Sequence, residues 1–154
     1  VVICSGVVEY LKNDELWIKQ VSGVLKPNGI LIVNVTNAYA IRRWSMPFIN
    51  IFKSIPGIFA TMNFIKTKIL RMEKLNSFPF KPRVHSPKQF DKFMNSQGLK
   101  KLSHNYFDFS IFPYPVDTVL NFILLKARKR MEKYTKTNAW LTGNGYIVKC
   151  KKNR

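Results

Sequence analysis

The chain has 154 residues, enough for one domain with its own core, which disfavours an arrangement of two full domains. Its 26 Lys and Arg against 8 Asp and Glu give a net charge of +18, and 46% of its residues are hydrophobic. This composition excludes a disordered basic tail and a collagen-like or disulfide-dense chain. The charge is compatible with an anionic partner, and equally with a compositional bias toward Lys, Asn and Ile.

The first 37 residues have the pattern of a strand, a helix and a second strand. Val1–Cys4 is a continuous apolar run, which predicts a parallel strand buried on both faces. Asn13 or Asp14 caps a helix with apolar residues every three or four positions, and Lys26-Pro27-Asn28-Gly29 ends it. The following Ile30–Val35 predicts a second buried strand. Such a unit implies a parallel sheet that is covered by helices.

The middle of the chain, residues 38–85, is a long basic and aromatic segment that several prolines interrupt. A structureless loop of this length would be unusual, so we predict short helices that cap the end of the sheet. Within it, residues 44–70 are hydrophobic, but the longest uncharged stretch is shorter than the roughly 20 residues that a spanning helix needs. This part is expected to form a lid over an apolar substrate, to lie on a membrane interface, or simply to pack against the same domain.

The last third, residues 86–154, contains two predicted helices and two predicted strands. Ser86 is placed as an N-cap with proline at the first helical position and glutamine at the third, and Gly98 ends this helix. A strand is expected over Leu99–Phe109, and a long helix over Val116–Tyr134. The basic second half of that helix is favoured by the helix dipole without any ligand. Residues 145–148 predict a last strand.

The two cysteines, Cys4 and Cys150, lie in apolar stretches with no CxxC spacing and no neighbouring histidine. We therefore predict neither a metal site nor a disulfide framework. Both residues are expected to be small buried core side chains in a reducing environment. The prediction is a cytoplasmic protein, with contact to a membrane surface left open.

Several segments resemble motifs of a known family. The string V-V-I-C-S-G-V-V-E-Y-L, a capped helix and L-K-P-N-G-I-L-I-V-N-V-T-N are similar to the fourth strand, its helix and the fifth strand of class I S-adenosylmethionine-dependent methyltransferases. R-V-H-S-P with Phe90 resembles a stretch of their small-molecule branch, the methyltransferase type 11/12-like proteins. The last strand resembles the family's antiparallel strand beside the fifth. Tyr10 stands where histidine is common, and Asn28 where glycine is common.

The resemblance implies a Rossmann-like three-layer α/β sandwich with a mostly parallel sheet and an antiparallel last strand. Nothing in the 154 residues matches the family's glycine-rich loop or the acidic residue that hold the cofactor. We therefore expect the C-terminal part of a methyltransferase domain, comprising a strand-helix-strand unit (1–37), a substrate cap or membrane-facing insertion (38–85) and C-terminal helices and strands (86–154). Without its missing N-terminal partner, this part is expected to bind S-adenosylmethionine poorly and to be inactive.

The resemblance also implies roles for residues that follow the first two strands. Cys4, Ser5 and Gly6 are expected to hold the methionine end of S-adenosylmethionine. Asn37 and Tyr39, just past the second strand, are candidate substrate contacts.

Three residues are candidates for catalysis, and each also has a structural interpretation. His85 is titratable and a candidate substrate contact, but it directly precedes the Ser86 N-cap and is equally suited to pack there. Tyr10 is expected near the transferred methyl group, or as a ring that covers the helix start. Glu9 is suited to orient substrate or accept a proton, or only to complement a helix dipole.

The predicted function is methyl transfer to a small, apolar or lipid-like acceptor. Nucleic-acid methylation is a second hypothesis, which the charge favours, although the basic residues are scattered and no Asn-Pro-Pro-aromatic block is present. The alternative outside enzymes is a non-catalytic basic module that binds nucleic acid or an anionic membrane.

Overall fold

The computed structural model describes residues 1–47, 82–112, 120–136 and 143–153, with single positions at 51, 57, 64, 67, 68, 117 and 141. Most of the predicted cap therefore lies outside the described residues. Of that segment the structure shows chiefly one short helix, α2 (Ile41–Trp44), directly after the second strand. None of the described helices is long and apolar enough to cross a membrane.

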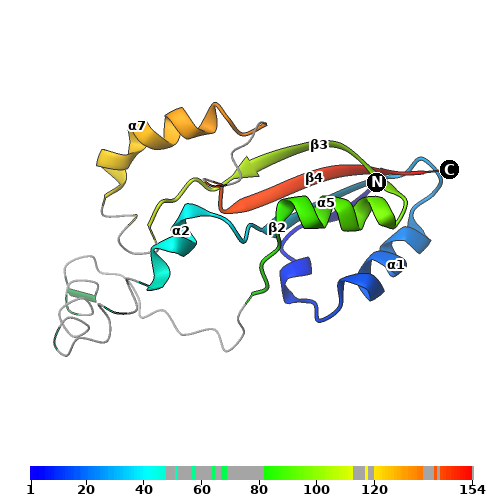
Figure 1. Ribbon diagram of the computed structural model, residues 1–154, viewed down its shortest axis with the longest axis horizontal. Coiled ribbons are helices and arrows are strands. Elements are labelled where there is room, and N and C mark those ends of the chain that lie inside the picture. The colour runs from blue at the N-terminus through cyan, green and yellow to red at the C-terminus, as the bar shows by residue number, and fades with distance from the viewer. Residues whose placement is uncertain are drawn as a thin grey trace.

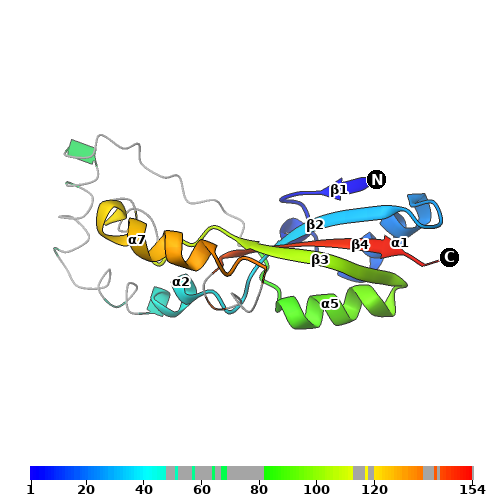
Figure 2. The same cartoon turned by 90° about the horizontal axis from the view of Figure 1, so that it is seen from above.

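Four strands form one sheet: β1 (Val2–Cys4), β2 (Ile30–Thr36), β3 (Leu99–Phe107) and β4 (Gly145–Lys152). Their order is β1-β2-β4-β3, with β1 and β3 at the two edges (Figures 1 and 2). β1 pairs with β2 in parallel, and β4 is antiparallel to both of its neighbours. Three strands therefore share one direction and the last runs against them. The expected α/β class and the antiparallel last strand are confirmed.

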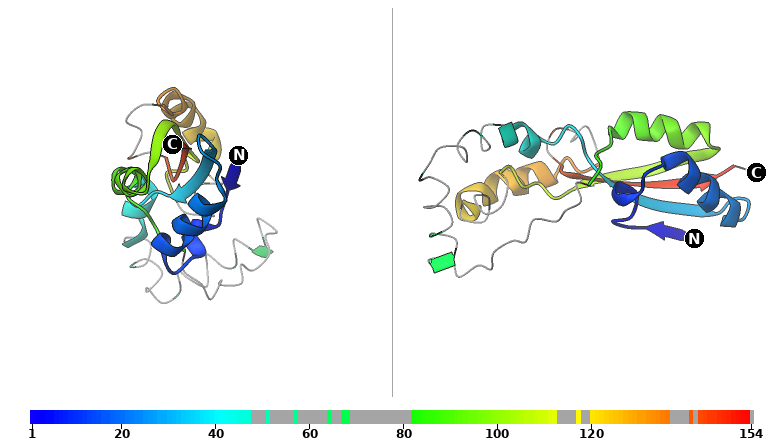
Figure 3. Two further views of the ribbon diagram at one scale, coloured as in Figure 1. Left: turned by 90° about the vertical axis from the view of Figure 1, so that its right-hand side faces the viewer. Right: turned by 90° about the horizontal axis from the view of Figure 1, so that it is seen from below.

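Helices α1 (Asp14–Val24) and α5 (Pro87–Ser96) cover the same face of this sheet (Figures 1 and 3). On that face, alternate residues of β2 are buried opposite alternate residues of β4, in the register Leu31–Cys150, Val33–Val148 and Val35–Tyr146. Apolar side chains from both helices pack into the same core, including Trp17, Ile18, Val21, Phe90 and Met94. The core therefore lies between one helix layer and one face of the sheet.

The prediction that the strands are buried on both faces is wrong, because the opposite face of the sheet is partly exposed. Ile3 is 67% exposed, while its neighbours Val2 and Cys4 pack against the core. Ile32 and Ile147 are also partly exposed. Over the described residues there are two layers, and the finer expectation of a three-layer sandwich is not shown. A third helix, α7 (Asn121–Glu132), lies beyond the carboxyl end of β3 (Figure 2).

Local signals placed the helix ends correctly. The side chain of Asn13 accepts hydrogen bonds from the N–H groups of Glu15 and Leu16, and Ser86 caps α5 through the N–H of Gln89. Asn28 adopts a left-handed conformation with φ of 62°. Asparagine tolerates this conformation, which glycine adopts freely, so the turn forms without a glycine at this position.

Candidate functional site

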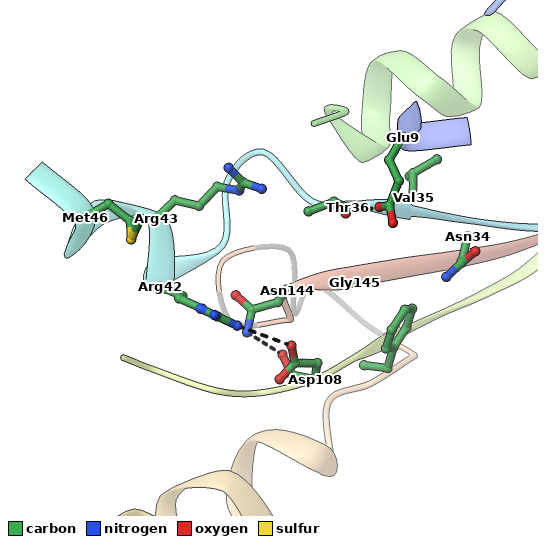
Figure 4. A pocket seen from close by; sticks show the side chains of 11 residues that line it. Glu9, Asn34, Val35, Thr36, Arg42, Arg43, Met46, Asp108, Asn144 and Gly145 are labelled. Atoms are coloured by element: carbon green, nitrogen blue, oxygen red, sulfur yellow. Dashed lines mark hydrogen bonds and ion pairs between the residues drawn. The ribbon is translucent and has the colours of Figure 1, made fainter. Parts of the chain in front are cut away.

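A cavity of about 400 Å³ opens where β2 and β3 end and β4 begins (Figure 4). Its walls come from these strand ends, from α2 and from the short 3₁₀ helix η1 (Val8–Tyr10). The carboxyl ends of parallel strands are the usual location of ligand sites in α/β sheets, because loops diverge there and leave a crevice. The cavity therefore lies at the usual edge of the sheet for a ligand site.

Glu9 is the catalytic candidate that lines this cavity. The hydroxyl of Thr36, at the end of β2, donates a hydrogen bond to the Glu9 carboxylate. The backbone carbonyl of Glu9 accepts a hydrogen bond of 2.8 Å from the N–H of Arg83. These contacts fix η1 beside the strand end, so the carboxylate is held at the cavity wall.

The loop after β1 contains a glycine with a positive φ and free space beside its Cα. Gly6 has φ of 64°, and no atom lies within 4 Å of the place where a Cβ would stand. Its N–H donates to Oδ1 of Asn34, at 2.7 Å, and Asn34 lines the cavity. Ser5 is exposed, whereas the Cys4 side chain packs against the core, where burial raises the pKa of its thiol.

His85 is buried and belongs to a partly exposed polar network at the start of α1. Its backbone exchanges hydrogen bonds of 2.9 Å with Thr36 and Ala38, which fastens it to the strand end. Its ring Nε2 is 3.2 Å from Oδ2 of Asp14, and both terminal nitrogens of Arg83 bind the same carboxylate at 2.8–2.9 Å. His85 is not among the cavity-lining residues that the structure describes. These contacts fit the structural interpretation of this residue.

Asn37 is fully buried, and its side chain and backbone bind segments next to the cavity. Its side-chain amide donates to the Gly143 carbonyl at 2.8 Å and accepts from the Tyr39 N–H at 3.0 Å. Its own carbonyl accepts a hydrogen bond of 3.0 Å from Nε of Arg43. Tyr39 and Tyr10 are exposed, and none of these three candidates lies in the described cavity lining. Their contacts with substrate stay predictions.

Two arginines in the cavity were missed from the sequence. Arg42 and Arg43 follow the end of β2 by six and seven positions, and α2 presents both to the cavity (Figure 4). Asn144, also in the lining, is buried and donates to the carbonyls of Asp108 and Ser110 at 2.7 and 2.9 Å. An adjacent arginine pair just past a strand end was the available signal, but it stood among 26 basic residues.

Among the residues that the structure describes, no group of three or more His, Cys, Asp or Glu is arranged to hold a metal ion. Comparison with models of known protein families and with curated proteins gave no match to this chain. Any functional assignment therefore depends on the sequence motifs, the strand order and the chemistry of the cavity.

Proposed function

We propose that this chain is the C-terminal part of a class I S-adenosylmethionine-dependent methyltransferase domain that methylates a small, apolar or lipid-like acceptor. The observation that carries the proposal is the strand order. The resemblance requires the last strand to lie antiparallel beside the second, and β4 does so along its length, from Ile30–Lys151 to Thr36–Gly145. β4 lies between β2 and β3, which both precede it in the sequence. This order is specific enough to support the assignment.

We assign the residues after β1 to the methionine end of the cofactor. No atom lies within 4 Å of the place where a Cβ of residue 6 would stand, and the hydrogen bond from the Gly6 N–H to Asn34 joins this loop to the cavity wall. When bound, S-adenosylmethionine would supply an electrophilic methyl group on its sulfonium. Methyl transfer then requires an acceptor that is held in line and, for a weakly acidic acceptor, a general base. Of the three catalytic candidates, Glu9 is the one in the described cavity lining, so we assign the base to it.

Substitution of Glu9 tests this assignment in protein that transfers methyl groups. In Glu9→Gln the proton acceptor is lost while the shape is kept, and we expect kcat to fall by about 10²-fold or more. Glu15→Gln, an exposed carboxylate in the first turn of α1, is the matched control and should keep full activity. Tritium transfer from labelled S-adenosylmethionine measures both. Equal kcat values for the two variants would remove Glu9 from the mechanism.

Contact with an anionic membrane is a refinement that α7 favours. Phe122 and Ile123 are 78% and 59% exposed, and the exposed Lys126, Lys129 and Arg130 follow on the same helix. Exposed apolar side chains beside cations suit a lipid surface better than nucleic acid, because the apolar side chains can insert at the acyl boundary while each basic residue near an anionic leaflet contributes about 1 kcal/mol. This observation also keeps the non-catalytic membrane-binding module as the second candidate.

Vesicle sedimentation tests the membrane contact. We expect the protein to sediment with phosphatidylserine vesicles and much less with phosphatidylcholine vesicles. Replacing Phe122 and Ile123 together with serine should weaken sedimentation without changing the circular dichroism spectrum. Equal sedimentation with both lipids would contradict the refinement, and binding of duplex DNA with a steep salt dependence would favour the nucleic-acid alternative.

A further inference from the structure

Arg43 has a polar arrangement that the proposed chemistry does not explain. Its Nε donates to the carbonyl of Asn37 at 3.0 Å, which holds the guanidinium in place. Its side chain lines the cavity, in which it extends from α2 toward the end of β2 (Figure 4). Among the described residues, no carboxylate forms an ion pair with it. The two terminal amino groups therefore belong to a cation that is held through Nε and contacts no carboxylate in the part of the chain that the structure describes.

The surroundings of Arg43 destabilise its positive charge. Partial burial, and next the charge of the adjacent Arg42, lower the pKa of Arg43, which means that its charged form is disfavoured by its surroundings. Glu9 acts in the opposite sense, but its effect is the smallest of the three, so the pKa is still lowered. An anion bound in the cavity would offset this destabilisation.

Arg42 is available as a second donor. Its guanidinium is 3.8 Å from Oδ2 of Asp108 and 3.3 Å from Oγ of Ser110, and both charged side chains of the pair are more than one third exposed. A solvated ion pair at this distance is weak, so Arg42 is readily diverted to a ligand. The remaining cavity wall includes apolar side chains from Val35, Met46 and Phe107.

We infer that the acceptor molecule carries a carboxylate or phosphate group, which Arg43 binds through its two terminal amino groups with Arg42 beside it. The planar guanidinium matches the paired oxygens of such groups and binds them through two parallel hydrogen bonds. The oxyanion anchors the acceptor, while the apolar wall holds its hydrocarbon part. A cavity of about 400 Å³ has the size of a small-molecule site. This inference rests on the proposed function only in naming the ligand as the methyl acceptor.

The test is binding of octyl phosphate and octanoate to the 154-residue chain, measured by calorimetry below their micellar concentrations, with octyl glucoside as the neutral probe. We expect both anions to bind and the neutral probe to bind much more weakly. Arg43→Gln should weaken anion binding by about tenfold or more, because charged hydrogen bonds are lost. Arg43→Lys should weaken it less, since the charge remains but the paired geometry does not. Lys19→Gln, which removes an exposed charge from α1, outside the cavity lining, should bind as the unmodified chain does.

Two further arms separate the sources of the anion. If inorganic phosphate or acetate displaces octyl phosphate, a free oxyanion is sufficient for binding. If only the alkyl compounds displace it, the ligand is an amphiphile. Either result supports recognition of an anion. Equal affinity for the neutral probe, or unchanged binding in Arg43→Gln that retains its circular dichroism spectrum, would overturn it. No cofactor takes part in these measurements, so their failure is distinguishable from failure of the methyltransferase proposal.

Discussion

Replacement of Tyr146 by phenylalanine tests how α5 is held on the sheet. The Tyr146 ring is fully buried, and its hydroxyl donates to Oδ1 of Asp91 on α5 at 2.6 Å. Nζ of Lys101 on β3 reaches the same hydroxyl at 2.7 Å and Oδ2 of Asp91 at 2.5 Å. The hydroxyl therefore joins a carboxylate and an ammonium group across three elements of the fold.

The magnitude follows from these contacts. A hydrogen bond to a charged group contributes about 1.5–3 kcal/mol, and in Tyr146→Phe the Asp91 carboxylate keeps Lys101 as its partner. We therefore expect the free energy of unfolding to fall by about 2 kcal/mol, a change of about thirtyfold in the folding equilibrium. Urea titration followed by the fluorescence of the tryptophans, including the buried Trp17, measures it. Tyr10→Phe, at a half-exposed ring, is the control and should change stability by less than about 0.5 kcal/mol. A loss in Tyr146→Phe no larger than in this control would refute the reasoning.

Three further predictions concern buried titratable side chains. Burial raises the pKa of Cys150 to about 11, so in a Cys4→Ser variant the remaining thiol should react with Ellman's reagent at pH 8 only after urea is added; fast reaction in the native state would contradict its burial. Burial also raises the pKa of Tyr106 from 10 to about 12. As the pH rises from 10 to 12, the Tyr106 hydroxyl loses its proton in the unfolded chain before it does so in the folded chain, so the free energy of unfolding should fall. In Tyr106→Phe this fall should be less steep. Equal dependence of the urea midpoint on pH in the two proteins would exclude this contribution. His85→Ala should lower the free energy of unfolding by about 1–2 kcal/mol through loss of the Asp14 contact but leave the KM for the acceptor unchanged, and a raised KM would return His85 to the site.

The helix ends and the strand segments were predictable because their signals are local. The caps at Asn13 and Ser86 and the glycine at 98 each act within a few residues, and the structure uses all three. The burial of the strands was not predictable in the same way. The run Val1–Cys4 is apolar throughout, and its composition is the same whether one or both faces are covered. Which face receives helices depends on distant segments.

The candidate site shows the same division between local and non-local signals. Glu9 became a candidate because it lies in the string after the first strand that resembles the methyltransferase motif, and the cavity lining includes it. Arg43 was not found, because its role depends on the Asn37 carbonyl and on walls from residues 107–108 and 144–145. Asn37 was placed correctly past the strand, but its amide bonds to Gly143, more than 100 positions away, instead of facing the cavity.

Calorimetric titration with S-adenosylmethionine tests the methyltransferase assignment most directly. It should be performed on the 154-residue chain and on the same chain extended by the residues encoded upstream of Val1. We predict micromolar binding by the extended protein, no measurable binding by the 154 residues alone, and weakened binding when Gly6 is replaced by valine in the extended protein. Micromolar binding by the 154 residues alone, or no binding by the extended protein, would contradict the assignment.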